Sequence, residues 1–226
     1  MRLNDGWLVY LTLVTTIPEL DPAAANASGE VHYVGPIFER IPEQRWDSPW
    51  DPDDDRPLVV VSFTTTGLWD QGGRLRNTVE ALAGELVRVI ASAPRGWDAT
   101  VPDNATVRRF VLHALVMPHA AVTVTHAGHG TVAASLAHGV PLVALPNPAA
   151  DQPFLAATLA RLGAGLALDG ASGPDTIRTA VNEVLKQASY AGAARAPAVK
   201  IRAMPGAAGA CDELERLAEA KVTAPV

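Results

Sequence analysis

The chain has 226 residues, of which 48% are hydrophobic and 19% are charged, and its formal net charge is −6. This composition is typical of a globular protein, and the length is enough for one full domain and part of another. The negative balance argues against non-specific nucleic-acid binding, although local amides and a histidine can still bind an anion.

The N-terminus contains an apolar run at residues 7–14 that has the length of a signal-peptide core. Asp5 and the interspersed threonines weaken that interpretation, and no segment reaches the ~20 apolar residues of a membrane span. The single cysteine, Cys211, excludes an internal disulfide and fits a reducing compartment. The sequence therefore predicts a cytoplasmic protein without stable membrane insertion.

The first fifty-six residues are expected to be a remnant strand followed by a linker. Residues 7–14 have the β-branched and aromatic composition of a buried strand, and no partner strand is expected in the next forty residues. Residues 18–57 are punctuated by prolines, which indicates a linker. Its acidic run, 51–55, has prolines on both sides and no supporting histidine or glutamate, so we interpret it as solvated and not as a metal site.

From Pro57 the pattern changes to an alternation of strands and helices. We expect strands at 58–63, 86–91, 107–111, 122–125, 141–145 and 165–168. We expect helices at 74–84, 113–119, 130–138, 153–161 and from 174 onward, with breaks near Pro197 and Pro205. The predicted fold class is α/β: a Rossmann-like, doubly wound parallel sheet of about six strands, with a division into residues 1–56 and 57–226.

This fold predicts where a ligand would bind. In the common strand order 3-2-1-4-5-6, a crevice opens between the carboxyl ends of strands one and four. Those ends carry the loops Thr64–Gly67 and His126–Thr131. The second loop has the composition of a phosphate cradle, because Gly128 and Gly130 let a ligand approach the backbone before a helix begins.

Several side chains at these loops suit a diphosphate. Thr64, Thr65 and Thr131 offer hydroxyl donors, and His126 can donate a charge-assisted hydrogen bond to a phosphate oxygen. One strand–helix unit later, Asp151 and Gln152 supply the acceptors and donors that suit sugar hydroxyls. An equally weighted alternative is that they form a helix N-cap before Pro153.

In combination, these motifs resemble the donor-binding region of family 1 glycosyltransferases, two-domain enzymes of the GT-B fold. The resemblance lies in Phe110-Val111-Leu112-His113, His-x-Gly-x-Gly-Thr from His126, Gly139-Val140-Pro141 and Asp151-Gln152. It extends to Tyr33–Pro36, like the interdomain linker, and to Val60–Thr65, like the first strand and loop of the C-terminal domain. The N-terminal acceptor domain of the family is missing except for the strand and linker before residue 57.

The resemblance implies roles by position. Base binding is implied for the segment that holds Phe110, Val111 and His113, and sugar binding for Asp151 and Gln152. Diphosphate contacts are implied for Thr64, Thr65, His126, Gly128, His129, Gly130 and Thr131.

Three positions depart from the family. Ala127 replaces a common glycine, and Leu112 replaces a common proline. Ala134 stands where many relatives have a glutamate on the ribose hydroxyls, which favours a dTDP-sugar donor over a UDP-sugar.

The leading hypothesis is therefore the donor-binding half of an inverting, metal-independent glycosyltransferase that transfers a hexose to a small-molecule acceptor. No cofactor is implied beyond the donor, and the general base is expected in the missing N-terminal acceptor domain, so this chain alone should be inactive. One alternative is a non-catalytic donor-binding subunit of a split enzyme. Another is a Rossmann-type epimerase, which is disfavoured because no Gly-x-Gly-x-x-Gly follows the first strand. An exposed N-terminal strand could also pair with a second copy and form a dimer.

Overall fold

A parallel sheet forms the centre of the molecule. The computed structural model describes residues 11–27, 29–38, 43, 45–63, 71–148 and 151–222. Within these ranges the sheet contains β3 (Leu58–Ser62), β4 (Arg88–Ser92), β5 (Ala105–Arg108), β6 (Ala120–Thr125), β7 (Leu142–Ala144) and β8 (Gly165–Ala167). Their spatial order is β5-β4-β3-β6-β7-β8, which confirms the predicted order 3-2-1-4-5-6.

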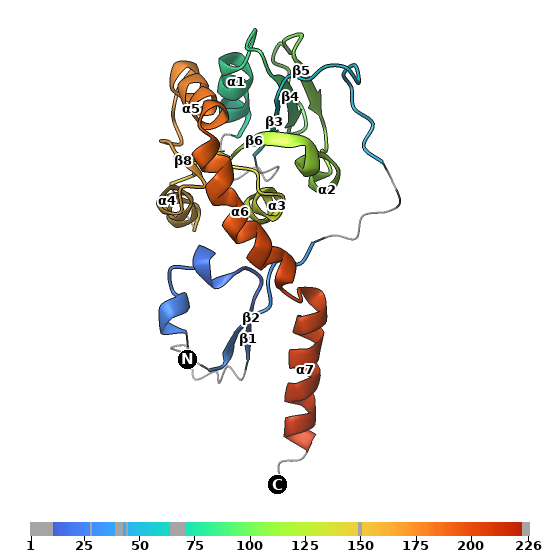
Figure 1. Ribbon diagram of the computed structural model, residues 1–226, viewed down its shortest axis with the longest axis vertical. Helices are drawn as coiled ribbons and strands as arrows, with labels where there is room; N and C mark the ends of the chain where they lie inside the picture. Colours follow the sequence, from blue (N-terminus) through green and yellow to red (C-terminus); the bar gives the residue numbers. More distant parts are fainter. Residues whose placement is uncertain are drawn as a thin grey trace.

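The helices cover both faces of this sheet, as the doubly wound prediction requires (Figure 1). Strand β3, Leu-Val-Val-Val-Ser, is buried along its whole length, which is the pattern of a central parallel strand. Its alternate residues Val59 and Val61 pack in one cluster with α1 (Gln71–Ala81) and α5 (Pro174–Lys186). Leu58 and Val60 face the opposite cluster, with α2 (His113–Val116) and α3 (His129–Ala137). Helix α4 (Gln152–Arg161) packs in a third cluster with α3 and β7.

The C-terminal helices differ from the prediction at one proline. Helix α6 (Ala188–Ala203) contains Pro197 in its interior, so the break expected there is wrong. The chain instead breaks at Gln187 and again around Pro205. Pro197 is buried beside Ala194, Ala198 and Ile201 on the face of α6 that packs against α3, and this burial compensates for the lost helical hydrogen bond.

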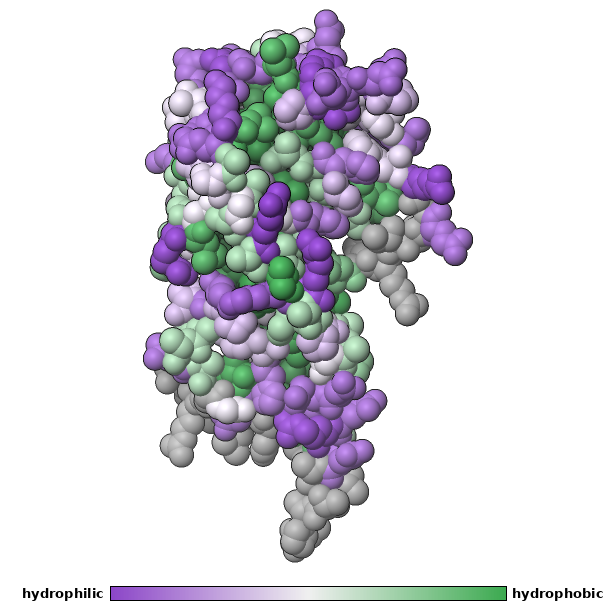
Figure 2. Space-filling model, in the orientation of Figure 1, coloured by the Kyte–Doolittle hydropathy of each residue, from purple (hydrophilic) through white to green (hydrophobic). Residues whose placement is uncertain are grey.

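The last helix extends away from the sheet. Helix α7 (Ala207–Val222) lies beside the N-terminal segment, far from β3 and β6 (Figure 1). Hydrophilic side chains gather over it in Figure 2, and Asp212, Glu215 and Arg216 are exposed. None of the helices in the described ranges is long and apolar enough to cross a membrane.

The N-terminal strand has a partner, so the expectation of an orphan strand is wrong. Strand β1 (Thr12–Val14) pairs in parallel with β2 (Val31–Tyr33), in a region that we interpreted as linker. Two 3-10 helices, Pro18–Leu20 and Ala24–Asn26, connect them. Strand β2 has only three residues with a histidine in the middle, which is shorter than the runs from which strands are recognised. Among the described residues β1 has a partner on one edge only, so pairing with a second copy through the other edge stays a prediction.

The N-terminal segment is fastened to the α/β domain. Ile17 and Leu20 are buried in the cluster that contains residues of α3, α4 and α6. Gly35, with φ 83°, lies so close to the α6–α7 junction that an added Cβ would stand 2.2 Å from Met204 Cβ. The Val34 carbonyl accepts a hydrogen bond of 2.7 Å from the Gly206 amide.

Candidate functional site

A cavity of about 640 Å³ lies at the carboxyl ends of β3 and β6, where the topology predicts a ligand site. It brings together eight of the predicted site residues: Phe110, Val111, His113, His126, Gly128, His129, Gly130 and Thr131. Thr64 and Thr65 lie outside the described residues, so their role stays a prediction.

The N-terminus of α3 forms one wall of this cavity. Gly128 is the N-cap, and the first intrahelical bond runs from the Val132 amide to the Gly128 carbonyl at 3.0 Å. The amides of residues 129–131 therefore precede the helical hydrogen-bond ladder, and the helix dipole adds partial positive charge there. A Cβ at Gly130 would meet no atom within 4 Å, so the backbone is open to a ligand at this point.

His126 lines the same cavity, next to the N-terminus of α3. Its side chain is only 8% exposed, and Nδ1 has no hydrogen-bond partner among the described residues. A Cβ at Gly128 would stand 2.5 Å from His126 Nε2, so the glycine makes room for the imidazole. Burial lowers the pKa of His126 below 6.5; Arg74 adds to this lowering, whereas the Ser62 backbone and Asp151 oppose it. The imidazole is therefore neutral at neutral pH in the free protein.

The turn between β6 and α3 uses a strained residue. Ala127 has φ 63°, the left-handed region that favours glycine, and its side chain is fully buried. The glycine that the family commonly has at this position would adopt this conformation without a steric penalty.

Part of the cavity lining is apolar. Phe110 is 68% exposed at its edge, whereas Val111 is buried. His113 Nε2 lies 3.0 Å from Ser62 Oγ and ties α2 to the end of β3. Ala134 also lines this cavity, and its methyl group offers no hydrogen-bonding partner.

Two lining residues come from the segment that follows β2, which was interpreted as linker. Ile37 and Phe38 line the cavity and are 52% and 48% exposed. The only sequence signal for them is a pair of large apolar residues directly after Pro36. Their contribution depends on the path of the chain between β2 and β3, which sequence patterns do not predict.

At the remaining edge, Asp151 contacts His129. His129 Nε2 lies 2.8 Å from Asp151 Oδ2, and both side chains are well exposed, at 45% and 58%. Asp151 stands at the N-cap position of α4, but its side chain makes no capping hydrogen bond. The N-cap alternative thus describes the backbone position of Asp151 and not the use of its carboxylate. The His129 imidazole is directed to Asp151, while its backbone amide stays in the α3 wall.

Gln152 has a different environment from Asp151. Its side chain is 7% exposed, and Oε1 accepts hydrogen bonds from the Asn147 amide at 3.0 Å and from Asn147 Nδ2 at 2.8 Å. The Gln152 amide oxygen therefore holds the loop after β7. A sugar-binding role for Asp151 and Gln152 stays a prediction.

Sequence reasoning missed Arg74 and Asn147. Arg74 Nη1 donates to Asn147 Oδ1, and Arg74 Nε donates to the Gly170 carbonyl at 2.7 Å. These partners are 73 and 96 positions away in the sequence, so no local pattern indicates them.

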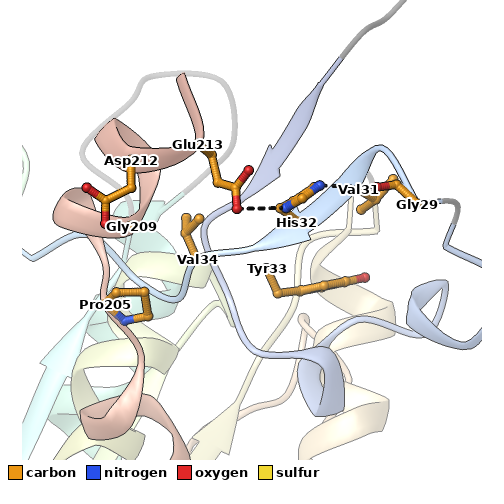
Figure 3. Close-up of a pocket in the computed structure, with 9 residues that line it drawn as sticks. All are labelled: Gly29, Val31, His32, Tyr33, Val34, Pro205, Gly209, Asp212 and Glu213. Atoms are coloured by element: carbon orange, nitrogen blue, oxygen red, sulfur yellow. Dashed lines mark hydrogen bonds and ion pairs between the residues drawn. The ribbon is translucent and has the colours of Figure 1, made fainter. Parts of the chain in front are cut away.

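A second cavity, of about 380 Å³, lies between β2 and α7 and holds no predicted site residue (Figure 3). Within it His32 Nδ1 lies 3.1 Å from Glu213 Oε1, and His32 Nε2 lies 3.1 Å from the Gly29 carbonyl. His32 therefore fastens β2 to α7. No group of three histidine, cysteine, aspartate or glutamate side chains within the described residues could hold a metal ion.

A doubly wound parallel sheet with a cavity at the carboxyl ends of its two central strands defines a Rossmann-type ligand-binding domain. Residues 74–217, more than half of the chain, match the family described as erythromycin biosynthesis protein CIII-like, C-terminal domain. The chain belongs to this family, and the predicted resemblance to the C-terminal half of family 1 glycosyltransferases is confirmed.

Similar proteins are named glycosyltransferases. The chain is 33% identical to 4'-demethylrebeccamycin synthase of Lentzea aerocolonigenes over 80% of this chain and 43% of that protein. It is 32% identical to TDP-daunosamine transferase DnrS of Streptomyces peucetius over 85% of this chain and 47% of that protein. The chain thus spans less than half the length of these curated relatives.

Solved structures agree with the family. The glycosyltransferase of kitacinnamycin superimposes with a TM-score of 0.80 at 29% identity, over 92% of this chain and 55% of that chain. The calicheamicin glycosyltransferase CalG4 gives a TM-score of 0.79 at 26% identity, over 97% of this chain and 54% of that chain. The fold is therefore that of the C-terminal part of a GT-B glycosyltransferase.

Proposed function

We propose that this chain binds the nucleotide-sugar donor of an inverting, metal-independent glycosyltransferase that transfers a hexose to a small-molecule acceptor. The observation that carries the proposal is the cavity at the carboxyl ends of β3 and β6. There the nearly buried His126, whose Nδ1 has no partner among the described residues, lies beside the N-terminus of α3.

The diphosphate occupies the end of the cavity formed by His126 and residues 128–131. Negative charge grows on the diphosphate as the bond to the sugar breaks, and donors that are already oriented stabilise that charge without reorganising. The α3 amides supply such donors, and the nearly buried His126 side chain supplies another. Because the α3 amides and the imidazole N–H donate hydrogen bonds to the diphosphate, the proposal requires no metal ion, and chelation with EDTA should leave nucleotide affinity unchanged.

The apolar part of the lining holds the nucleoside, with Phe110 against the base and Val111 beside it. Ala134 lines the cavity with a methyl group, so a ribose 2'-hydroxyl facing it would lose its water without gaining a partner. This favours dTDP over UDP as the nucleotide. In support, the 26% identical glycosyltransferase VinC is described in complex with dTDP, although UDP-glucosyltransferase avaP of Aspergillus versicolor is a 30% identical relative.

Asp151 holds the donor sugar with the carboxylate oxygen that His129 does not contact. This Oδ1 can accept a hydrogen bond from a sugar hydroxyl. Gln152 supports the same region through its bonds to Asn147.

The other half of the complete enzyme binds the acceptor and supplies the general base. A base must lie about 3 Å from the acceptor hydroxyl, so it belongs to the wall opposite the donor. The chain covers 43% and 47% of the two relatives named above, which leaves room for such a domain. Alone, the chain should bind nucleotide and transfer little or no sugar, and rapid transfer to any acceptor would contradict this part of the proposal. A pull-down that recovers a stoichiometric acceptor-domain protein would favour the split-enzyme alternative, whereas the family match argues against an epimerase.

The test is a calorimetric titration with dTDP and UDP, for the wild type and His126→Ala. Loss of a hydrogen bond to a charged group costs ~1.5–3 kcal/mol, so we expect the variant to bind dTDP about 10-fold to 150-fold more weakly. Equal affinity in the two proteins would remove His126 from the site.

A further inference from the structure

Arg74 joins three segments that meet at the carboxyl edge of the sheet. It stands in the first turn of α1, the helix that follows β3. Its Nη1 donates to Asn147 Oδ1 in the loop after β7, and its Nε donates to the Gly170 carbonyl in the loop after β8 at 2.7 Å. These two loops pack tightly, since a Cβ at Gly170 would stand 2.1 Å from the Pro146 carbonyl oxygen.

The contacts continue from Arg74 to the residues beside the sugar end of the site. Asn147 accepts from Arg74 through Oδ1 and donates to Gln152 Oε1 through Nδ2, at 2.8 Å. A guanidinium has only donors, so it fixes the orientation of the Asn147 amide group, and that group in turn fixes Gln152. Asn147 is completely buried and Gln152 is 7% exposed. Loss of these hydrogen bonds would therefore leave buried polar groups without water to replace their partners, which costs free energy.

We propose that Arg74 is a positioning residue, which fastens the Asp151–Gln152 turn to the start of α1 through Asn147 and so holds the donor-sugar end of the site in place. The inference rests on the proposed function for its ligand, and on the hydrogen bonds of Arg74 for its geometry. Arg74 does not need to touch the donor, because its effect passes through Asn147 and Gln152.

The charge of Arg74 has a second effect, on the diphosphate end. It lowers the pKa of His126 in the same direction as burial does, and against Asp151 and the Ser62 backbone. Arg74 therefore helps keep His126 neutral in the free protein. Replacement of Arg74 by lysine keeps the charge and loses the planar, forked donor set, whereas replacement by methionine loses both.

The experiment compares Arg74→Lys and Arg74→Met with the control Arg76→Met. Arg76 lies on the same helix and is exposed, and its Nη2 lies 3.8 Å from Asp98 Oδ1. Hydrogen exchange of the Asn147 amide reports the loop directly, without any ligand. We expect both Arg74 variants to accelerate this exchange about 10-fold or more, and the control to leave it unchanged.

Calorimetry with dTDP and with dTDP-glucose then separates the sugar from the diphosphate. Both Arg74 variants should weaken dTDP-glucose about 10-fold more than dTDP, and Arg74→Lys should keep dTDP affinity within about 3-fold. The pKa of His126, followed by NMR titration, should rise in Arg74→Met and stay low in Arg74→Lys.

These measurements separate failure of the inference from failure of the proposed function. Unchanged Asn147 exchange in both Arg74 variants overturns the positioning role, as does an equal weakening of dTDP and dTDP-glucose. If the wild type binds neither nucleotide, the proposed function fails, and Asn147 exchange still decides whether Arg74 holds the loop.

Discussion

At the residue scale, the two glycines before and within the first turn of α3 are held by different constraints. The His126 side chain requires a glycine at position 128, because a Cβ there would stand 2.5 Å from His126 Nε2. A Cβ at Gly130 would meet no atom within 4 Å, although this residue lines the cavity. The fold itself therefore requires a glycine at position 128. At position 130 a glycine is needed only if a ligand occupies the adjacent space.

A pair of alanine substitutions tests this distinction. Gly130→Ala should leave the free energy of unfolding unchanged or raise it by up to ~1 kcal/mol, because alanine is the better helix former. It should nevertheless weaken dTDP binding, since the methyl group occupies space that the ligand needs. Gly128→Ala should lower both stability and affinity. Denaturant unfolding and calorimetry on the two variants measure these effects, and a Gly130→Ala protein with wild-type affinity would show that the diphosphate lies elsewhere.

His126 makes the stability of the chain depend on pH. The pKa of His126 in the folded protein lies below 6.5. At higher pH the imidazole is therefore neutral in the folded and the unfolded state, and it does not change the free energy of unfolding with pH. As the pH falls below 6.5, the unfolded chain binds a proton that the folded chain does not, and the free energy of unfolding falls by at most ~1.4 kcal/mol per pH unit.

We therefore expect His126→Gln to flatten the dependence of the free energy of unfolding on pH in the range of about 5 to 6.5. His138 contributes a slope of the same sign, because burial and Arg202 also lower its pKa, so the slope should be reduced and not abolished. Identical slopes in urea unfolding for wild type and variant would contradict the burial of His126.

At the scale of elements, most strands after Pro57 were predictable because they are apolar runs between turns, whereas β5, Ala-Thr-Val-Arg, is half-buried to exposed and lies at Ala105–Arg108 and not at 107–111. The continuous burial of β3 and the strand order follow from that pattern and from the rules of parallel sheets. Pro197 was mispredicted because its tolerance depends on tertiary packing against α3. The pairing of β1 with β2 was missed because a three-residue strand carries too little periodicity.

The helices differ in how much they contribute to the free energy of unfolding of this chain. Ile177 of α5 is completely buried against the sheet, whereas Leu214 of α7 is 53% exposed. Ile177→Ala should therefore lower the free energy of unfolding by ~2–5 kcal/mol. Leu214→Ala should change it by less than ~0.5 kcal/mol. Denaturant unfolding measures both effects. A large loss of stability for Leu214→Ala would mean that this side chain is buried in solution, against its exposure in the structure.

At the scale of the whole molecule, the location of the candidate site was predictable, and its polar network was not. The carboxyl ends of strands one and four coincide with the two polar loops in the sequence, so fold and motif indicate one place. The links from Arg74 to Asn147 and Gly170, by contrast, join residues that only the folded chain brings together. Ile37 and Phe38 reach the cavity for the same reason, from the segment between the two sheets.

The central claim is that this chain is a nucleotide-sugar donor domain, and direct titration of the purified chain with dTDP tests it most directly. UDP, His126→Ala and Gly130→Ala serve as comparisons, the last because it should fold as stably as the wild type. The account predicts saturable binding of dTDP, weaker binding of UDP, and a loss of about 10-fold or more in His126→Ala. Absence of dTDP and UDP binding, or binding that neither variant weakens, would contradict it.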